Sequence, residues 1–168
     1  MPIILRFVHA TDIVSDGILV DTGGKYSHVE AVTPEGKLLG AHASGGVLAR
    51  PANYDAGKFD RERFLHLTAA DEAMAAKFYH YLNAVIGEPY DFGAIAGFVS
   101  HLDIHQQHRV ICSALQALAL RWCEYLPVVL PVPAHELSPR DLEMGLIMRP
   151  DVRGIPRPSI LNTNLKAA

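Results

Sequence analysis

Cys112 could act as a nucleophile because of its place in the chain. The stretch from Arg109 to Tyr125 has no Gly or Pro and carries apolar residues at helical spacing, which predicts a largely buried helix beginning near Cys112. A thiol at a helix N-terminus has a lowered pKa, because unpaired amides and the helix dipole stabilise the thiolate. The alternative is that Cys112 is a small buried core residue.

A predicted hairpin contains His28, which could act as the base. Segments 26–32 and 37–43 are strand-like, and they flank the turn-forming sequence Thr33-Pro34-Glu35-Gly36. If the turn is centred near Glu35, paired residue numbers sum to about 70, which places His28 opposite or next to His42. His28 could then take the proton of a nucleophile while a neighbour holds its ring in place.

Two residues compete for the role of orienting His28. Glu30 lies two positions further along the same strand and therefore projects from the same face as His28. Side chains directly opposite each other approach more closely than same-strand neighbours two positions apart. We therefore predict His42 as the third catalytic residue and keep Glu30 as the alternative orienter.

Metal binding is a separate possibility for the histidines. A further group lies in a polar stretch and consists of His101, His105 and His108. No additional ligand stands at a spacing typical of zinc sites, so a polar surface loop is the better interpretation and we expect no metal there. Convergence of His28, His42 and Cys112 would give a zinc site, which remains open at this point.

The positions of the remaining elements follow from periodicity and turn signals. A first strand, strands near 47–50 and 64–67, and helices over 11–20, 69–86 and 92–100 are predicted, with a short helix started by Ser138-Pro139. The chain after residue 146 is punctuated by Pro, and we expect an irregular tail over 147–168. Residues 1–146 would then form one α+β domain with a central, mostly antiparallel sheet.

Composition narrows the class of protein. The chain of 168 residues has a net charge of -3 and 49% hydrophobic residues, which is typical of a globular domain. Its basic residues are scattered, so we expect no nucleic-acid partner. No apolar stretch reaches the roughly 20 residues of a spanning helix, and no cofactor motif is present. The N-terminus does not resemble a secretion signal, which predicts a cytoplasmic protein.

An ordered set of short motifs resembles a known family. They are Ser27-His28-Val29, Gly45-Gly46-Val47, Pro89-Tyr90-Asp91 and Cys112-Ser113, in that order. The set is similar to that of the circularly permuted NlpC-type papain-like cysteine hydrolases, especially small bacterial and prophage-encoded members. The resemblance covers about residues 2–145. It implies a permuted papain-like fold in which the histidine strand precedes the helix that carries the cysteine.

The same resemblance implies a function. It assigns Cys112 as nucleophile and His28 as base, with the third position on the strand that contains His42. The expected activity is that of a cysteine peptidase or amidase, with cell-wall peptides or acyl compounds as substrates. Related sequences often carry Glu after the Cys-Ser pair, where this chain has Ala114. That departure supports the alternative of a catalytically silent, prophage-associated binding or accessory domain.

Overall fold

The computed structural model describes residues 1–11, 23–91, 111–126 and 133–163. The helices predicted over 11–20 and 92–100 lie outside the described residues, apart from Thr11. The histidines at positions 101, 105 and 108 also lie outside them.

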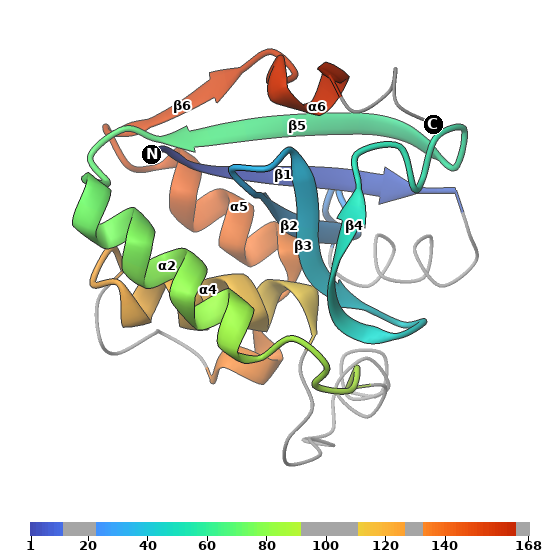
Figure 1. Ribbon diagram of the computed structural model, residues 1–168, viewed down its shortest axis with the longest axis horizontal. Helices are drawn as coiled ribbons and strands as arrows, with labels where there is room; N and C mark the ends of the chain where they lie inside the picture. The colour runs from blue at the N-terminus through green and yellow to red at the C-terminus, as the bar shows by residue number, and fades with distance from the viewer. Residues whose placement is uncertain (12–22, 92–110, 127–132, 164–168) are drawn as a thin grey trace.

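A six-stranded antiparallel sheet forms the centre of the protein, in the order β4-β3-β2-β1-β5-β6 (Figure 1). The strands are β1 (Ile3–Ala10), β2 (His28–Val32), β3 (Lys37–His42), β4 (Gly46–Pro51), β5 (Phe59–Leu67) and β6 (Val152–Ile155). The predicted α+β class with an antiparallel sheet is confirmed. Hairpin connections place the strand with His28 beside β3, while the first strand of the chain sits between β2 and β5.

Side chains cap the first turn of two of the helices. They are α2 (Glu72–Ala84), α4 (Cys112–Trp122), α5 (Pro139–Ile147) and α6 (Ile160–Thr163), with a 3-10 turn η1 (Ala134–Glu136). The helix predicted over 69–86 is shorter at both ends. It begins after Asp71, which caps its first turn by accepting from the Met74 N–H, and it ends before the C-cap Val85. Ser138 and Asp141 form a capping box at the start of α5.

One face of the sheet packs against α2 and α4 (Figure 1). Fully buried strand residues such as Leu5, Phe7 and Val29 meet Phe78 and Leu115 from the two helices. Each such side chain contributes about 1.5–3 kcal/mol through removal from water. Because α4 contacts both β2 and β3, this packing fixes the start of α4 beside the hairpin.

The end of the chain differs from the irregular tail predicted for residues 147–168. Val152–Ile155 forms β6, which pairs with β5 from Phe64 to Leu67 and completes one edge of the sheet. Leu161 of α6 is buried with Phe64 and Leu38 on the face of the sheet opposite α2. The predicted domain of residues 1–146 therefore does not contain the whole sheet, because residues 152–155 add a strand to it.

Helices that could cross a membrane were expected to be absent. Within residues 1–11, 23–91, 111–126 and 133–163, none of the helices has the length and apolar character that a span requires.

Candidate active site

The β2–β3 hairpin has the register that its turn predicts. Ala31 opposes Leu39 and Val32 opposes Leu38, so paired residue numbers sum to about 70. The same register carries His28 to His42, whose ring centroids are 4.9 Å apart. The prediction that these histidines are cross-strand neighbours is confirmed.

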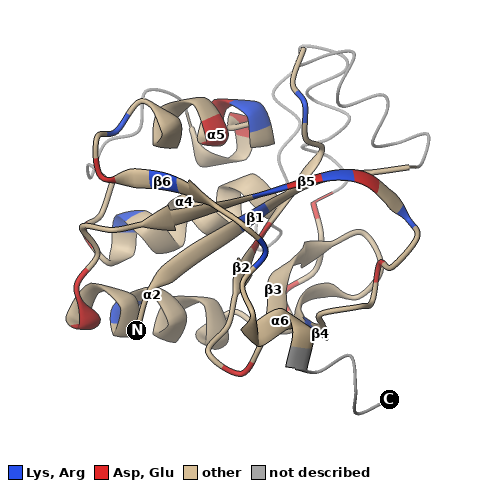
Figure 2. Ribbon diagram, turned by 90° about the horizontal axis from the view of Figure 1, so that it is seen from above, with Lys and Arg blue, Asp and Glu red and all other residues tan. Residues whose placement is uncertain are grey.

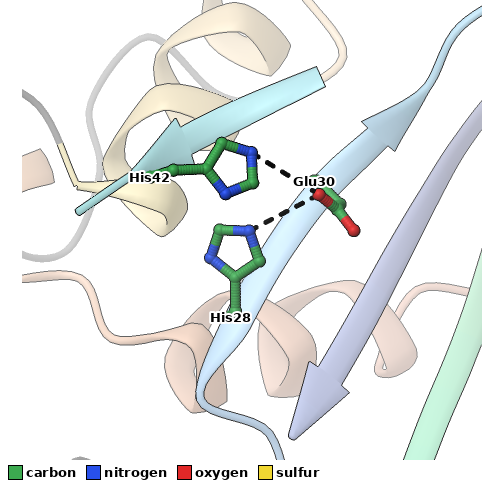
Figure 3. Close-up of side chains that lie close together, drawn as sticks. All are labelled: His28, Glu30 and His42. Carbon is green, nitrogen blue, oxygen red and sulfur yellow. Dashed lines mark ion pairs between the residues drawn. The ribbon is translucent and has the colours of Figure 1, made fainter. Parts of the chain in front are cut away.

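Glu30 lies beside the two histidines, with its carboxylate facing both rings (Figure 3). Its Oε2 atom lies 3.5 Å from His28 Nε2 and 3.8 Å from His42 Nε2. Both separations exceed the roughly 3.2 Å limit of an ordinary N–H···O hydrogen bond. The Glu30 side chain is fully buried. A single carboxylate oxygen thus faces one nitrogen from each ring.

Gly40 makes room for this carboxylate. It lies on β3, and a Cβ atom at this position would stand 3.0 Å from the Cβ of Glu30. Real Cβ atoms rarely approach a neighbour so closely. A residue without a side chain at position 40 therefore lets Glu30 pack against the neighbouring strand.

A buried arginine holds the carboxylate from the other side. Arg6 Nη1 donates to Glu30 Oε1 at 2.7 Å and to Asp55 at 2.7 Å, while its Nε donates to Glu62 at 2.9 Å. Glu62 belongs to the run of alternating charges on β5 (Figure 2). Tyr54 donates to Glu30 Oε2 at 3.1 Å. Four side chains thus fix the carboxylate or its arginine partner.

Cys112 is the first residue of α4, as the sequence predicts. It is 3% exposed, and the neighbouring His28 acts to lower the pKa of its thiol. His28 Nε2 faces Glu30 and has no hydrogen-bond partner among the described residues. The structure therefore brings Cys112, His28, His42 and Glu30 together in one buried cluster.

The charges in the cluster favour an ion pair between Cys112 and His28. Burial alone would raise the pKa of the Cys112 thiol, but His28 outweighs it, and backbone N–H groups of Val29 and Ser113 add to the lowering. For His28, burial acts to lower the pKa, while Cys112 and then Glu30 raise it above its ordinary value. Both shifts act in the direction that favours a thiolate beside an imidazolium.

His42 and Glu30 differ sharply in charge. Burial and the neighbouring His28 lower the pKa of His42 to about 3, so its ring is neutral at neutral pH. Burial would raise the pKa of Glu30, but His28 and Arg6 overcome this and lower it to about 2. The ionised carboxylate faces the free nitrogen of His28, so the geometry favours Glu30 over His42 as its orienting partner.

Sequence reasoning did not identify Arg6, Asp55 or Tyr54. Arg6 interrupts the otherwise apolar start of β1, and a lone charged residue in such a strand is a signal for a buried ion pair. Asp55 and Tyr54 follow β4 and carry no comparable signal, since they reach the site only through the folded chain.

A metal could be held by part of this cluster. Among the described residues, His28, Glu30 and His42 offer one ligand atom each, and these atoms lie within 4.8 Å of one another. Two imidazoles and a carboxylate are a donor set that zinc accepts in proteins. The expectation for histidines 101, 105 and 108 falls outside the described residues.

Comparisons with known proteins give a fold but no function. No family model matches the chain, and no curated protein matches it. A similar solved structure is the crystal structure of metalloprotein yiiX from Escherichia coli O157:H7, DUF1105, with a TM-score of 0.64 and 15% sequence identity. The similarity covers 94% of this chain and 97% of that one, so the two share the fold along nearly their whole lengths.

Proposed function

We propose that this protein is a cysteine hydrolase of the amidase or peptidase type, with a circularly permuted papain-like fold. The observation that carries the proposal is the contact between Cys112 at the start of α4 and His28, with Glu30 on the far side of the imidazole ring. Its motifs resemble those of the permuted NlpC-type family. The histidine strand precedes the cysteine helix in the chain, as that family requires.

The proposed reaction is acyl transfer to water. The Cys112 thiolate attacks the carbonyl carbon of an amide or ester, and the C–N or C–O bond breaks as His28 gives its proton to the leaving group. His28 then takes a proton from water, whose oxygen attacks the thioester and releases the acid together with the free thiol. The Cys112 backbone N–H and a second donor would stabilise the oxyanion.

Glu30 would act by fixing the His28 ring. A carboxylate on Nε2 favours the ring orientation in which Nδ1 faces the thiol, and it stabilises the imidazolium formed during the reaction. Arg6 and Tyr54 would keep the carboxylate in place through their hydrogen bonds. Peptides and other acyl compounds are the proposed substrate class.

A second candidate is a silent binding domain that keeps the papain-like fold without turnover. Burial favours it, since Cys112 is only 3% exposed and Ala114, where relatives often carry Glu, is 4% exposed. A thiol so enclosed could remain in the fold for packing alone.

Acyl-enzyme trapping separates the two candidates. The protein would be incubated with p-nitrophenyl acetate and with an acyl-peptide ester panel, quenched in acid, and analysed by intact and peptide mass spectrometry. A hydrolase accumulates an acyl adduct on Cys112 that disappears with time, and Cys112→Ser does not form a thioester. Absence of any adduct on Cys112, although iodoacetamide alkylates it, would support the silent domain.

A further inference from the structure

Two buried nitrogens in the cluster lack the partners that buried polar atoms normally have. His28 Nε2 and His42 Nε2 are shielded from solvent, and neither has a hydrogen-bond partner among the residues the structure describes. His42 as a whole is 9% exposed. Such orphaned atoms call for an explanation, because most buried polar side-chain atoms are paired.

The two nitrogens converge on one oxygen. Figure 3 shows both rings directing a nitrogen toward Glu30, and the distances to Oε2 are 3.5 Å from His28 and 3.8 Å from His42. Ligand atoms bound at about 2.0–2.2 Å to a tetrahedral zinc ion lie about 3.3–3.6 Å apart. The separations are therefore long for hydrogen bonds and close to those between ligands of one ion.

Supporting contacts are also in place. Glu30 Oε1 accepts from Arg6 and Oε2 accepts from Tyr54, so the carboxylate is held by outer partners. Arg6 brings one positive charge, but it pairs with three carboxylates, those of Glu30, Asp55 and Glu62. The negative charge of these three carboxylates therefore exceeds the positive charge of Arg6 and could balance a divalent cation.

We propose that His28 Nε2, His42 Nε2 and Glu30 Oε2 form a zinc site, and that zinc bound there reversibly silences Cys112. Imidazole and carboxylate ligands suit zinc, and three protein ligands leave a fourth position for water. Cys112 is outside the ligand set. The silencing, but not the binding, rests on the proposed hydrolase function.

The silencing follows from the protons of His28. Zinc replaces the proton on Nε2, which is released to solvent, and leaves a single proton on Nδ1 beside Cys112. The metal-bound ring would have to become an imidazolate to protonate a leaving group, and its Nε2 is no longer available. Acyl transfer from substrate to Cys112 therefore stops while the thiol itself stays uncoordinated.

Binding is tested first in the Cys112→Ser protein by titration calorimetry with zinc chloride. One equivalent is expected, and adding His42→Ala or His42→Gln should weaken it by more than about 100-fold, since loss of even an outer-shell partner costs about 10- to 100-fold. His80→Ala, which removes an exposed histidine on α2, is the matched control and should bind as Cys112→Ser does. Circular dichroism verifies that each variant is folded.

Cobalt reports on the ligands in the wild-type protein. Co²⁺ should give the visible bands of a tetrahedral ion without a thiolate charge-transfer band. A charge-transfer band would make Cys112 a ligand and overturn the proposed set. Binding that survives both His42 variants, or that is lost in His101→Ala or His105→Ala, would also overturn it.

The two proposals fail in different ways. If zinc binds as expected but no acyl adduct forms on Cys112 even in chelator, the hydrolase function fails and the metal site stands. If adducts form in chelator and zinc does not bind, the metal site fails alone. When both hold, zinc should suppress adduct formation at the concentration that half-saturates the site, and binding without suppression would overturn the silencing.

Discussion

The two cysteines of this protein lie at opposite ends of one helix. Cys112 is the first residue of α4, and Cys123 is its C-cap, where Sγ donates to the Leu120 carbonyl at 3.3 Å. Both are buried and neither forms a disulfide. Both thiols are buried and each lies at an end of α4, so they differ in the groups that surround them at the two ends of the helix.

That environment reverses the behaviour of the thiol. Burial raises the pKa of Cys123, and the contacts around it do not overcome the effect. Burial also acts to raise the pKa of Cys112, yet His28 lowers it below the ordinary value. Burial therefore does not decide whether a cysteine is inert, because one charged partner at a helix start outweighs it.

The largest effect should come from removing that partner. His28→Ala is expected to slow iodoacetamide labelling of Cys112 at neutral pH by about 100-fold or more, a size typical of lost acid–base assistance. The variant should make Cys112 resemble Cys123. Peptide mass spectrometry measures both sites in one sample, and His66→Ala on β5 serves as control. Unchanged labelling in His28→Ala would remove the basis of the comparison.

The pH profile should sharpen the contrast in the wild-type protein. Because its pKa is lowered, Cys112 stays a thiolate as pH falls below about 8.5, the ordinary thiol value, whereas Cys123, with a raised pKa, becomes a thiolate only above it. At pH about 6.5, where an ordinary thiol is about 1% ionised, Cys112 should therefore label faster than Cys123. Parallel profiles for the two sites would contradict the ion pair.

A smaller effect is expected from the orienting carboxylate. Glu30→Gln should reduce Cys112 labelling by about 10-fold, because the amide keeps the shape but no longer stabilises the imidazolium. His42→Ala should reduce it less, since the neutral His42 ring does not stabilise that charge. A larger loss of labelling in His42→Ala than in Glu30→Gln would instead make His42 the third catalytic residue. Labelling rates are measured in native buffer, and thermal unfolding of each variant verifies that it is folded under those conditions.

The smallest effect concerns the end of the chain. Arg157 donates to Glu62 at 2.8 Å and is partly exposed, so Arg157→Ala should lower the free energy of unfolding by about 0.2–1 kcal/mol. Urea unfolding measures the change, with Arg153→Ala as control. Cys112 labelling should stay the same. A fall comparable to that of Glu30→Gln would show that this segment acts on the site.

Local features of the site could be predicted from the sequence. The turn at Thr33-Pro34-Glu35-Gly36 determines the hairpin register, and the helical spacing of apolar residues after Arg109, without Gly or Pro, predicts a helix near Cys112. These predictions depend on neighbours in the chain. The prediction of His42 as the residue that orients His28 depends only on the closeness of opposite strand positions. Ring orientation and the charge of Arg6, which favour Glu30, arise only in the folded chain.

Features that depend on distant partners could not be predicted. Arg6 contacts Asp55 and Glu62 only after β1 pairs with β5, and no local pattern encodes that pairing. The short strand β6 stands between Pro150 and Pro156, so its sequence favours an irregular segment until β5 offers an edge. Non-local pairing thus overrides local signals at both places.

The order of the site along the chain has a consequence for its synthesis. His28 and Glu30 leave the ribosome about 80 residues before Cys112, an interval of about 4–16 s at about 5–20 residues per second. Throughout that interval the nascent chain carries Arg6, His28 and Glu30 without either thiol. His28 and Cys112 can therefore come together only after α4 has been synthesised and packs against the hairpin.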